Sequence, residues 1–195
     1  KNRGVTNYYK GNSRKAFTLT ELMAVVVILG LIMMIAIPNT LSMIDKNKKT
    51  TYIENAKTFV SLVQNKVRTD KSLEEPENNE MALIITLDFL DTSDVQYSPY
   101  GEEYDKEGSF VVSVVESNKL QYYVHLVSCA NKDGCSKNDL SNWRGIELVN
   151  VNLLNEDNRF DLIKSSDVNV NLIDQYQGHS LFSGSNIKTI YKNDV

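Results

Sequence analysis

The chain has 195 residues, of which 42% are hydrophobic and 24% are charged, a composition typical of a folded protein. This length suits one hydrophobic segment and one globular domain of modest size. Residues 1–16 carry five basic and no acidic residues, so the formal net charge of −4 leaves −9 for the remainder. The acidic remainder argues against a general phosphate-binding surface, and we predict no specific nucleic-acid partner.

A long apolar run follows the basic flank directly. It extends over residues 22–37, and a helix covering residues 17–37 is ~31 Å long, which is enough to cross a bilayer core. The positive-inside rule predicts that the basic flank stays in the cytoplasm and that the rest of the chain lies outside. Glu21 stands at the mouth of this run, although a carboxylate inside a bilayer costs roughly 2.5–3.5 kcal/mol or more.

Three explanations compete for the apolar run. A secretory signal that is cleaved after the run would have a shorter apolar region and a small-residue cleavage site, which residues 38–43 do not offer. An ordinary membrane anchor fits the length but leaves Glu21 unexplained. A cut before Phe17 keeps the helix in the mature protein and creates a free amine that the Glu21 carboxylate can neutralise. We prefer this third explanation.

The pattern becomes amphipathic beyond Pro38. Apolar residues recur there at mostly three- and four-residue steps, and charged residues fill much of the other face. We predict one helix from about Phe17 to about Arg68, with its second half packed on a sheet. Pro38 removes one backbone hydrogen bond, and Gly30 weakens the helix by ~1 kcal/mol relative to Ala. The stretch between them is either a built-in soft segment or simply a tolerated kink.

The remaining residues predict the loops and short strands of a globular domain. Polar and turn-forming residues predict loops at 71–80 and 97–105. Stretches rich in Val and Tyr, residues 109–115 and 120–127, predict an antiparallel hairpin. Residues 81–90 are apolar enough for a short helix or a buried connector. A third strand is expected at 145–154, short elements at 160–163 and 168–173, and a last strand at 187–191.

The chain contains two cysteines, Cys129 and Cys135. In an exported domain we expect them to form a disulfide that closes a small loop, worth roughly 2–3 kcal/mol. Two free thiols in a reduced protein are the alternative. No second Cys or His pair stands at zinc-ligand spacing, so we expect no metal and no cofactor.

We expect no catalytic activity. His125 lies in a predicted strand, where a satisfied or surface histidine is the simpler explanation, and His179 lies in a predicted loop without a partner at suitable spacing. The acidic pairs Glu74–Glu75 and Glu102–Glu103 are typical of solvated loops rather than of a general acid and base. Sheet packing explains most of the ten tyrosines better than an adhesive surface does.

Residues 14–44 resemble the class III signal and N-terminal helix of type IV pilins and pseudopilins. The resemblance consists of basic residues before Phe17, a carboxylate at Glu21, a long apolar run and a proline at Pro38. The aromatic loop at residues 98–101, which precedes a Val-rich hairpin, is also similar to pilins from Gram-positive bacteria. The resemblance implies an α+β fold in which a long N-terminal helix packs on a small antiparallel sheet.

The resemblance also implies specific roles for residues near the N-terminus. A prepilin peptidase is expected to cut between Ala16 and Phe17 and to N-methylate Phe17. The family generally has Gly before the cut, so Ala16 is a departure for which we expect slower processing. Glu21 of one subunit is expected to meet the Phe17 amine of a neighbour. The helix is expected to loosen between Gly30 and Pro38 during assembly.

The implied organisation has four parts: a cytoplasmic leader (1–16), a transmembrane assembly helix (17–38), the amphipathic half of the helix (39–70) and a sheet-containing head (71–195). The expected partners are the prepilin peptidase, the assembly platform and ATPase, other pilins and the membrane. The subunit is expected in the cytoplasmic membrane, with its N-terminus inside and its head outside, before it enters an extracellular pilus.

The expected function is that of a structural pilus subunit, major or minor, which serves adhesion, motility or aggregation. A pseudopilin of a competence DNA-uptake or type II secretion system is one alternative. A membrane-anchored binding protein that never polymerises is another.

Overall fold

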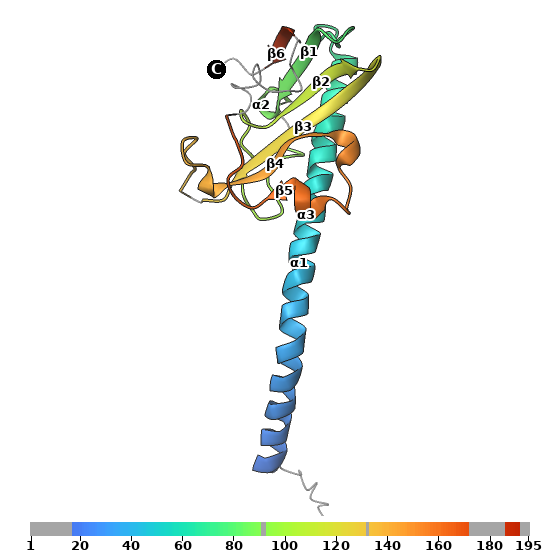
Figure 1. The fold of residues 1–195 in the computed structure, drawn as a ribbon. Helices are drawn as coiled ribbons and strands as arrows, with labels where there is room; N and C mark the ends of the chain where they lie inside the picture. The colour runs from blue at the N-terminus through green and yellow to red at the C-terminus, as the bar shows by residue number, and fades with distance from the viewer. Residues whose placement is uncertain (1–16, 91–92, 132, 172–185, 192–195) are drawn as a thin grey trace, which may run out of the picture. The chain divides into compact units, whose positions relative to one another are not determined.

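The computed structural model describes residues 17–90, 93–131, 133–171 and 186–191 (Figure 1). The chain divides into two compact units, the first ending at Ile44 and the second beginning at Asp45. One helix, α1, contributes to both units, and all the described strands belong to the second.

The long helix α1 covers Leu19–Thr69, which confirms the prediction of one helix to within two residues at each end. Pro38 lies inside it. Its last turn carries Lys66 and Arg68, and positive charge is favourable there because the helix dipole places partial negative charge at the C-terminus. Lys66 also pairs with Asp70 just beyond the helix end, with Nζ 3.2 Å from Oδ2.

In the second unit, one face of α1 packs on the sheet (Figure 1). The buried side chains of this face recur at three- and four-residue spacing, as the amphipathic pattern predicts. They are Tyr52, Ile53, Ala56, Phe59, Val60, Val63 and Val67. Their main partners on the sheet are Leu83, Ile85, Val111, Val124, Leu126 and Ile146.

The sheet has six strands in the order β5-β4-β3-β2-β1-β6. They are β1 (Met81–Thr86), β2 (Phe110–Glu116), β3 (Lys119–Cys129), β4 (Trp143–Asn150), β5 (Ile163–Lys164) and β6 (Asn186–Tyr191). Strands β1 to β5 pair antiparallel, as expected. The expected antiparallel sheet is thus confirmed over five strands, and β6 adds a parallel pairing with β1 at one edge.

The prediction for residues 81–90 was wrong in part. The segment forms the strand β1 followed by the single helical turn α2 (Leu87–Leu90). Leu83 and Ile85 face the core shared with α1, whereas Ala82 and Ile84 belong to a second apolar cluster with Phe110 of β2. A strand that is buried on both faces shows no alternation in its sequence, so its pattern cannot be told from that of a short buried helix.

The predicted hairpin is confirmed as β2 and β3. Glu116 pairs with Lys119, and the two residues between them, Ser117 and Asn118, have φ values of 50° and 60°. Two consecutive residues in the left-handed region are typical of the two-residue turn whose twist matches that of the flanking strands.

Strands β3 and β4 approach each other unusually closely at Gly145. A Cβ atom there would lie 2.2 Å from the carbonyl oxygen of Leu126, so only glycine fits this position. The register then shifts: Leu126 pairs with Ile146, but Val124 pairs with Val149. Two residues of β4 therefore oppose the single residue His125, which is the pattern of a β-bulge.

The rest of the chain after β4 contains short elements. The expected strand at 145–154 ends early, at Asn150, and continues as the 3-10 turn η2 (Val151–Leu153). The element expected at 160–163 corresponds to the helical turn α3 (Arg159–Leu162) and the start of β5. Residues 168–171 form no helix or strand, and 172–173 lie outside the described residues. The strand expected at 187–191 lies within β6.

The aromatic loop at 97–105 is confirmed as a loop, and polar contacts tie it to its surroundings. Two of these contacts are with α1. The Tyr100 hydroxyl donates to Oδ1 of Asp45 at 3.2 Å, and the side-chain amide of Asn55 donates to the Tyr104 hydroxyl at 3.0 Å. The Ser128 hydroxyl, on β3, donates to Oε2 of Glu102 at 2.7 Å. The loop is therefore anchored to the helix and to the sheet.

Candidate assembly site

Thr18 and Glu21 hold each other at the start of α1. The backbone N–H of Thr18 donates to Oε2 of Glu21 at 2.8 Å, and the Thr18 hydroxyl donates to the same oxygen at 2.9 Å. In return, the Thr18 hydroxyl accepts from the backbone N–H of Glu21 at 3.3 Å. This reciprocal arrangement is a capping box, in which two backbone donors of the first helical turn find side-chain acceptors.

The capping box gives Glu21 a second role, within its own chain, that was not predicted. A carboxylate in the first turn also interacts favourably with the positive end of the helix dipole. The signal was present, because Thr18 and Glu21 have the Thr-x-x-Glu spacing of a capping box directly before an apolar run. Glu21 was expected to need a partner that compensates its charge in the apolar run. Thr18 meets part of this need within the same chain.

The helix that follows Glu21 exposes a continuous apolar surface. Large apolar side chains between Leu22 and Ile37 are each 48% to 73% exposed. By length and composition, α1 can cross a membrane, and none of its most apolar window is buried within the chain. An apolar surface of this extent requires a cover, either lipid or the same surface of other subunits.

Gly30 and Pro38 lie within this apolar stretch. A Cβ atom at Gly30 would meet no described residue within 4 Å, so no described neighbour requires glycine there. Pro38 lacks the N–H that would bond to the carbonyl of Met34. Near the proline, the Thr40 hydroxyl donates to the Ala36 carbonyl at 2.9 Å.

Comparison with known families agrees with this geometry. Residues 11–37 match the model described as the prokaryotic N-terminal methylation motif. They form a class III signal peptide. This is the signal of type IV pilins and pseudopilins, and it indicates a structural subunit that a prepilin peptidase processes and that polymerises with pilins. No curated protein and no solved structure matches the chain significantly.

The methylation motif includes the expected cleavage site. Ala16 lies outside the described residues, and Phe17 is 84% exposed at the start of the described chain. Phe17 directly precedes the capping box, so an amine created on Phe17 would adjoin Thr18 and stand one helical turn from Glu21. The motif and the apolar helix together fit anchoring in a membrane.

Cys129 and Cys135 belong to the second unit, where they form a disulfide with a Cα–Cα distance of 5.6 Å. The bond closes the loop between β3 and the 3-10 turn η1 (Leu140–Asn142). Both cysteines pack against an apolar cluster that includes Trp143, whose indole N–H donates to the carbonyl of Ser136 at 3.0 Å. The loop is therefore fixed to the sheet at the start of β4.

His125 is fully buried beside Phe110, with ring centroids 5.1 Å apart. Neither ring nitrogen makes a hydrogen bond of normal geometry to a described residue. Burial lowers the pKa of His125 to about 4, and the Glu147 carboxylate and the Asn169 backbone oppose this shift only in part. His125 is therefore a core residue and not a surface one. His179 lies outside the described residues.

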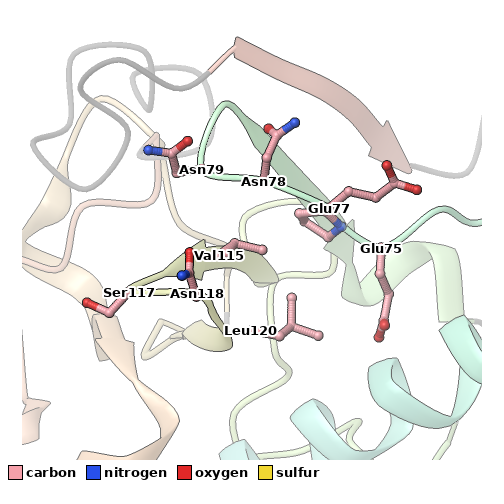
Figure 2. Close-up of a pocket in the computed structure, with 9 residues that line it drawn as sticks. Glu75, Glu77, Asn78, Asn79, Val115, Ser117, Asn118 and Leu120 are labelled. Atoms are coloured by element: carbon pink, nitrogen blue, oxygen red, sulfur yellow. The ribbon is translucent and has the colours of Figure 1, made fainter.

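One surface depression of the second unit is polar and open (Figure 2). It has a volume of about 690 Å³ and lies between the 75–79 loop and the β2–β3 hairpin. Figure 2 shows Glu75 and Glu77 on one side and Ser117 and Asn118 on the other. Among the described residues, no group of His, Cys, Asp or Glu is arranged to hold a metal.

Proposed function

We propose that this chain is the structural subunit of a type IV pilus, either a major or a minor pilin. In this proposal it is cleaved between Ala16 and Phe17, N-methylated on Phe17 and polymerised through the first half of α1. The observation that carries the proposal is the position of Glu21, a carboxylate in the first turn of an exposed apolar helix that bears the methylation motif.

The electrostatic argument concerns the amine that cleavage creates. The Glu21 carboxylate and the Phe17 amine of a neighbouring subunit carry opposite charges in a low-dielectric environment, so pairing cancels two costly charges. Removal of one partner would strand the other at a cost of roughly 3–5 kcal/mol. The pair would set the register between subunits, and packing of residues 22–37 would supply most of the cohesion.

The second half of the chain would then be displayed outside the membrane. The disulfide of Cys129 and Cys135, at the end of β3, is suited to an oxidising exterior, where disulfides persist. The leader, residues 1–16, would stay in the cytoplasm with its five basic residues. Adhesion, motility or aggregation would follow from the display of the head on a fibre.

Two other functions remain candidates. Pseudopilins of competence or secretion systems carry the same signal, so the motif supports them equally. A membrane-anchored binding protein that does not polymerise is favoured by one observation, the capping box. Because Thr18 already satisfies one oxygen of Glu21, a lone subunit in the membrane is less costly than an isolated carboxylate would be.

Mass analysis of the mature N-terminus tests the cleavage directly, and a start at methyl-Phe17 is expected. A mature protein with its leader intact, or one that starts beyond Pro38, would end the proposal. Polymerisation is tested by shearing cells that express Glu21→Ala. We expect sheared fibres to be lost while the membrane pool persists.

Glu54→Ala is the matched control, since Glu54 is an exposed acidic residue of the same helix. Its side chain forms an ion pair with Lys57. The substitution should leave fibre yield unchanged. If transformation or secretion is lost while wild-type cells show no fibres, the pseudopilin function is the correct one.

A further inference from the structure

The two oxygens of the Glu21 carboxylate differ in the structure. Both Thr18 donors, the backbone N–H and the hydroxyl, bind Oε2, at 2.8 Å and 2.9 Å. Among the described residues, Oε1 has no hydrogen-bond partner. One oxygen is therefore anchored within the chain, and the other is available.

The anchor survives the processing step. Cleavage between Ala16 and Phe17 breaks the peptide bond whose nitrogen belongs to Phe17. The N–H used in the capping box belongs to Thr18, one residue further on, and so remains an amide after the cut. The hydroxyl of Thr18 and the carboxylate of Glu21 are equally untouched. The box can therefore form in the precursor, in the mature subunit and in a polymer.

We propose that Thr18 is a positioning residue for assembly, which holds Glu21 through Oε2 so that Oε1 accepts the amine of a neighbouring subunit. This inference rests on the proposed function and deepens it. The Glu21 side chain has three rotatable bonds, and fixing them beforehand lowers the entropy lost when the neighbour binds. Polymerisation then adds a partner to the carboxylate without displacing the existing one.

Thr18 affects assembly through its hydrogen bonds to Glu21 and not through recognition by the peptidase. Thr18→Val removes the hydroxyl but keeps the size and the β-branching of the side chain. Thr18→Ser restores the hydroxyl and thus the box. The matched control is Thr20→Val, a threonine two residues further along the same exposed turn. Glu21→Gln removes the negative charge but keeps an acceptor oxygen.

Each variant is expressed as the full chain in the native bacterium, and three quantities are measured: the mass of the mature N-terminus, the membrane pool and the sheared fibre fraction. We expect Thr18→Val to be cleaved and methylated normally but to lower the fibre fraction by about 2- to 30-fold, the range that loss of an N-cap side chain produces in an equilibrium constant. Thr18→Ser and Thr20→Val should stay within about twofold of the wild type. The double variant Thr18→Val/Glu21→Gln should be no worse than Glu21→Gln alone, because both changes remove one interaction.

The outcomes separate this inference from the proposed function. Wild-type fibre yield in Thr18→Val together with failure of Glu21→Gln overturns the positioning role and leaves the proposed function standing. Impaired cleavage of Thr18→Val also overturns it, since Thr18 would then serve recognition by the peptidase. Wild-type yield in Glu21→Gln overturns both.

Discussion

The guanidinium group of Arg144 lies over the ring of Tyr100, with Cζ 3.8 Å from the ring centroid. The same side chain approaches Glu102, with Nε 3.4 Å from Oε1. Tyr100 in turn donates to Asp45 at the beginning of the second unit. A residue of β4 thus holds the aromatic loop, and the loop holds the first turn of α1 in this unit.

Arg144→Ala should destabilise the head. The stacking on Tyr100 is lost, and the Glu102 carboxylate, whose side chain is 11% exposed, keeps only its hydroxyl donors. Cation–aromatic stacking and a partly buried ion pair together suggest a loss of about 2 kcal/mol. Urea unfolding in detergent, followed by near-ultraviolet circular dichroism, measures it. Lys137→Ala, which breaks an exposed pair with Glu107, should change stability by less than ~0.5 kcal/mol. Equal losses in the two variants would contradict the structural role of Arg144.

Gly30→Ala tests whether the helix must loosen during assembly. The new Cβ meets no neighbour among the described residues, so the change should stabilise the helix by ~1 kcal/mol. If assembly requires partial unwinding between Gly30 and Pro38, the sheared fibre fraction should fall. Ala36→Gly, in the same stretch, weakens the helix instead. It should therefore not lower the sheared fibre fraction by preventing unwinding. Unchanged fibre yield in Gly30→Ala would show that no such loosening is needed.

Loss of the disulfide should lower the free energy of unfolding of the head by roughly 2–3 kcal/mol, the value expected for a short closed loop. The double variant Cys129→Ser/Cys135→Ser is compared with the wild type by urea unfolding. A reductant should destabilise the wild-type protein by a similar amount and leave the variant unaffected. A wild-type protein insensitive to reductant would indicate that the bond contributes nothing to stability.

His125 should make the head sensitive to acid. The pKa of His125 in the folded protein, about 4, lies below the ordinary value of 6.5. Between pH 6.5 and pH 4, His125 is therefore protonated in the unfolded chain but neutral in the folded protein. Stability is therefore full above pH 6.5 and falls as the pH drops towards 4, by about 3 kcal/mol in all. Urea unfolding at pH 7 and pH 4.5 measures most of this loss.

His125→Leu is the control for the acid sensitivity, because leucine is apolar and does not titrate. Hydrogen bonds from Ser72 lower the pKa of Asp70, and hydrogen bonds from Ser141 lower the pKa of Asp139. Protonation of these two carboxylates therefore destabilises the folded state only at still lower pH, and it does so equally in the wild type and the variant. The same pH dependence in wild type and variant would refute the assignment to His125.

Some elements of the fold were predictable because their signals are strong and local. The hairpin of β2 and β3 is bounded by a polar turn, and α1 combines an apolar run with an amphipathic continuation. The strand β1 was not recognised, since its two buried faces remove the alternation that marks a strand. The direction of β6 was equally hidden, because a strand sequence does not state whether its neighbour runs parallel or antiparallel.

The sequence by itself determined the signal and the long apolar helix. Partition into a membrane depends on one uninterrupted apolar stretch of the chain, and the capping box of Thr18 and Glu21 depends on residues within one turn, so both signals are visible in the sequence. Only the tertiary structure decided the parallel edge strand, the burial of His125 and the contact between Arg144 and Tyr100. These features join residues that are far apart in the chain, and alternative pairings of similar local preference are separated only by how well they pack.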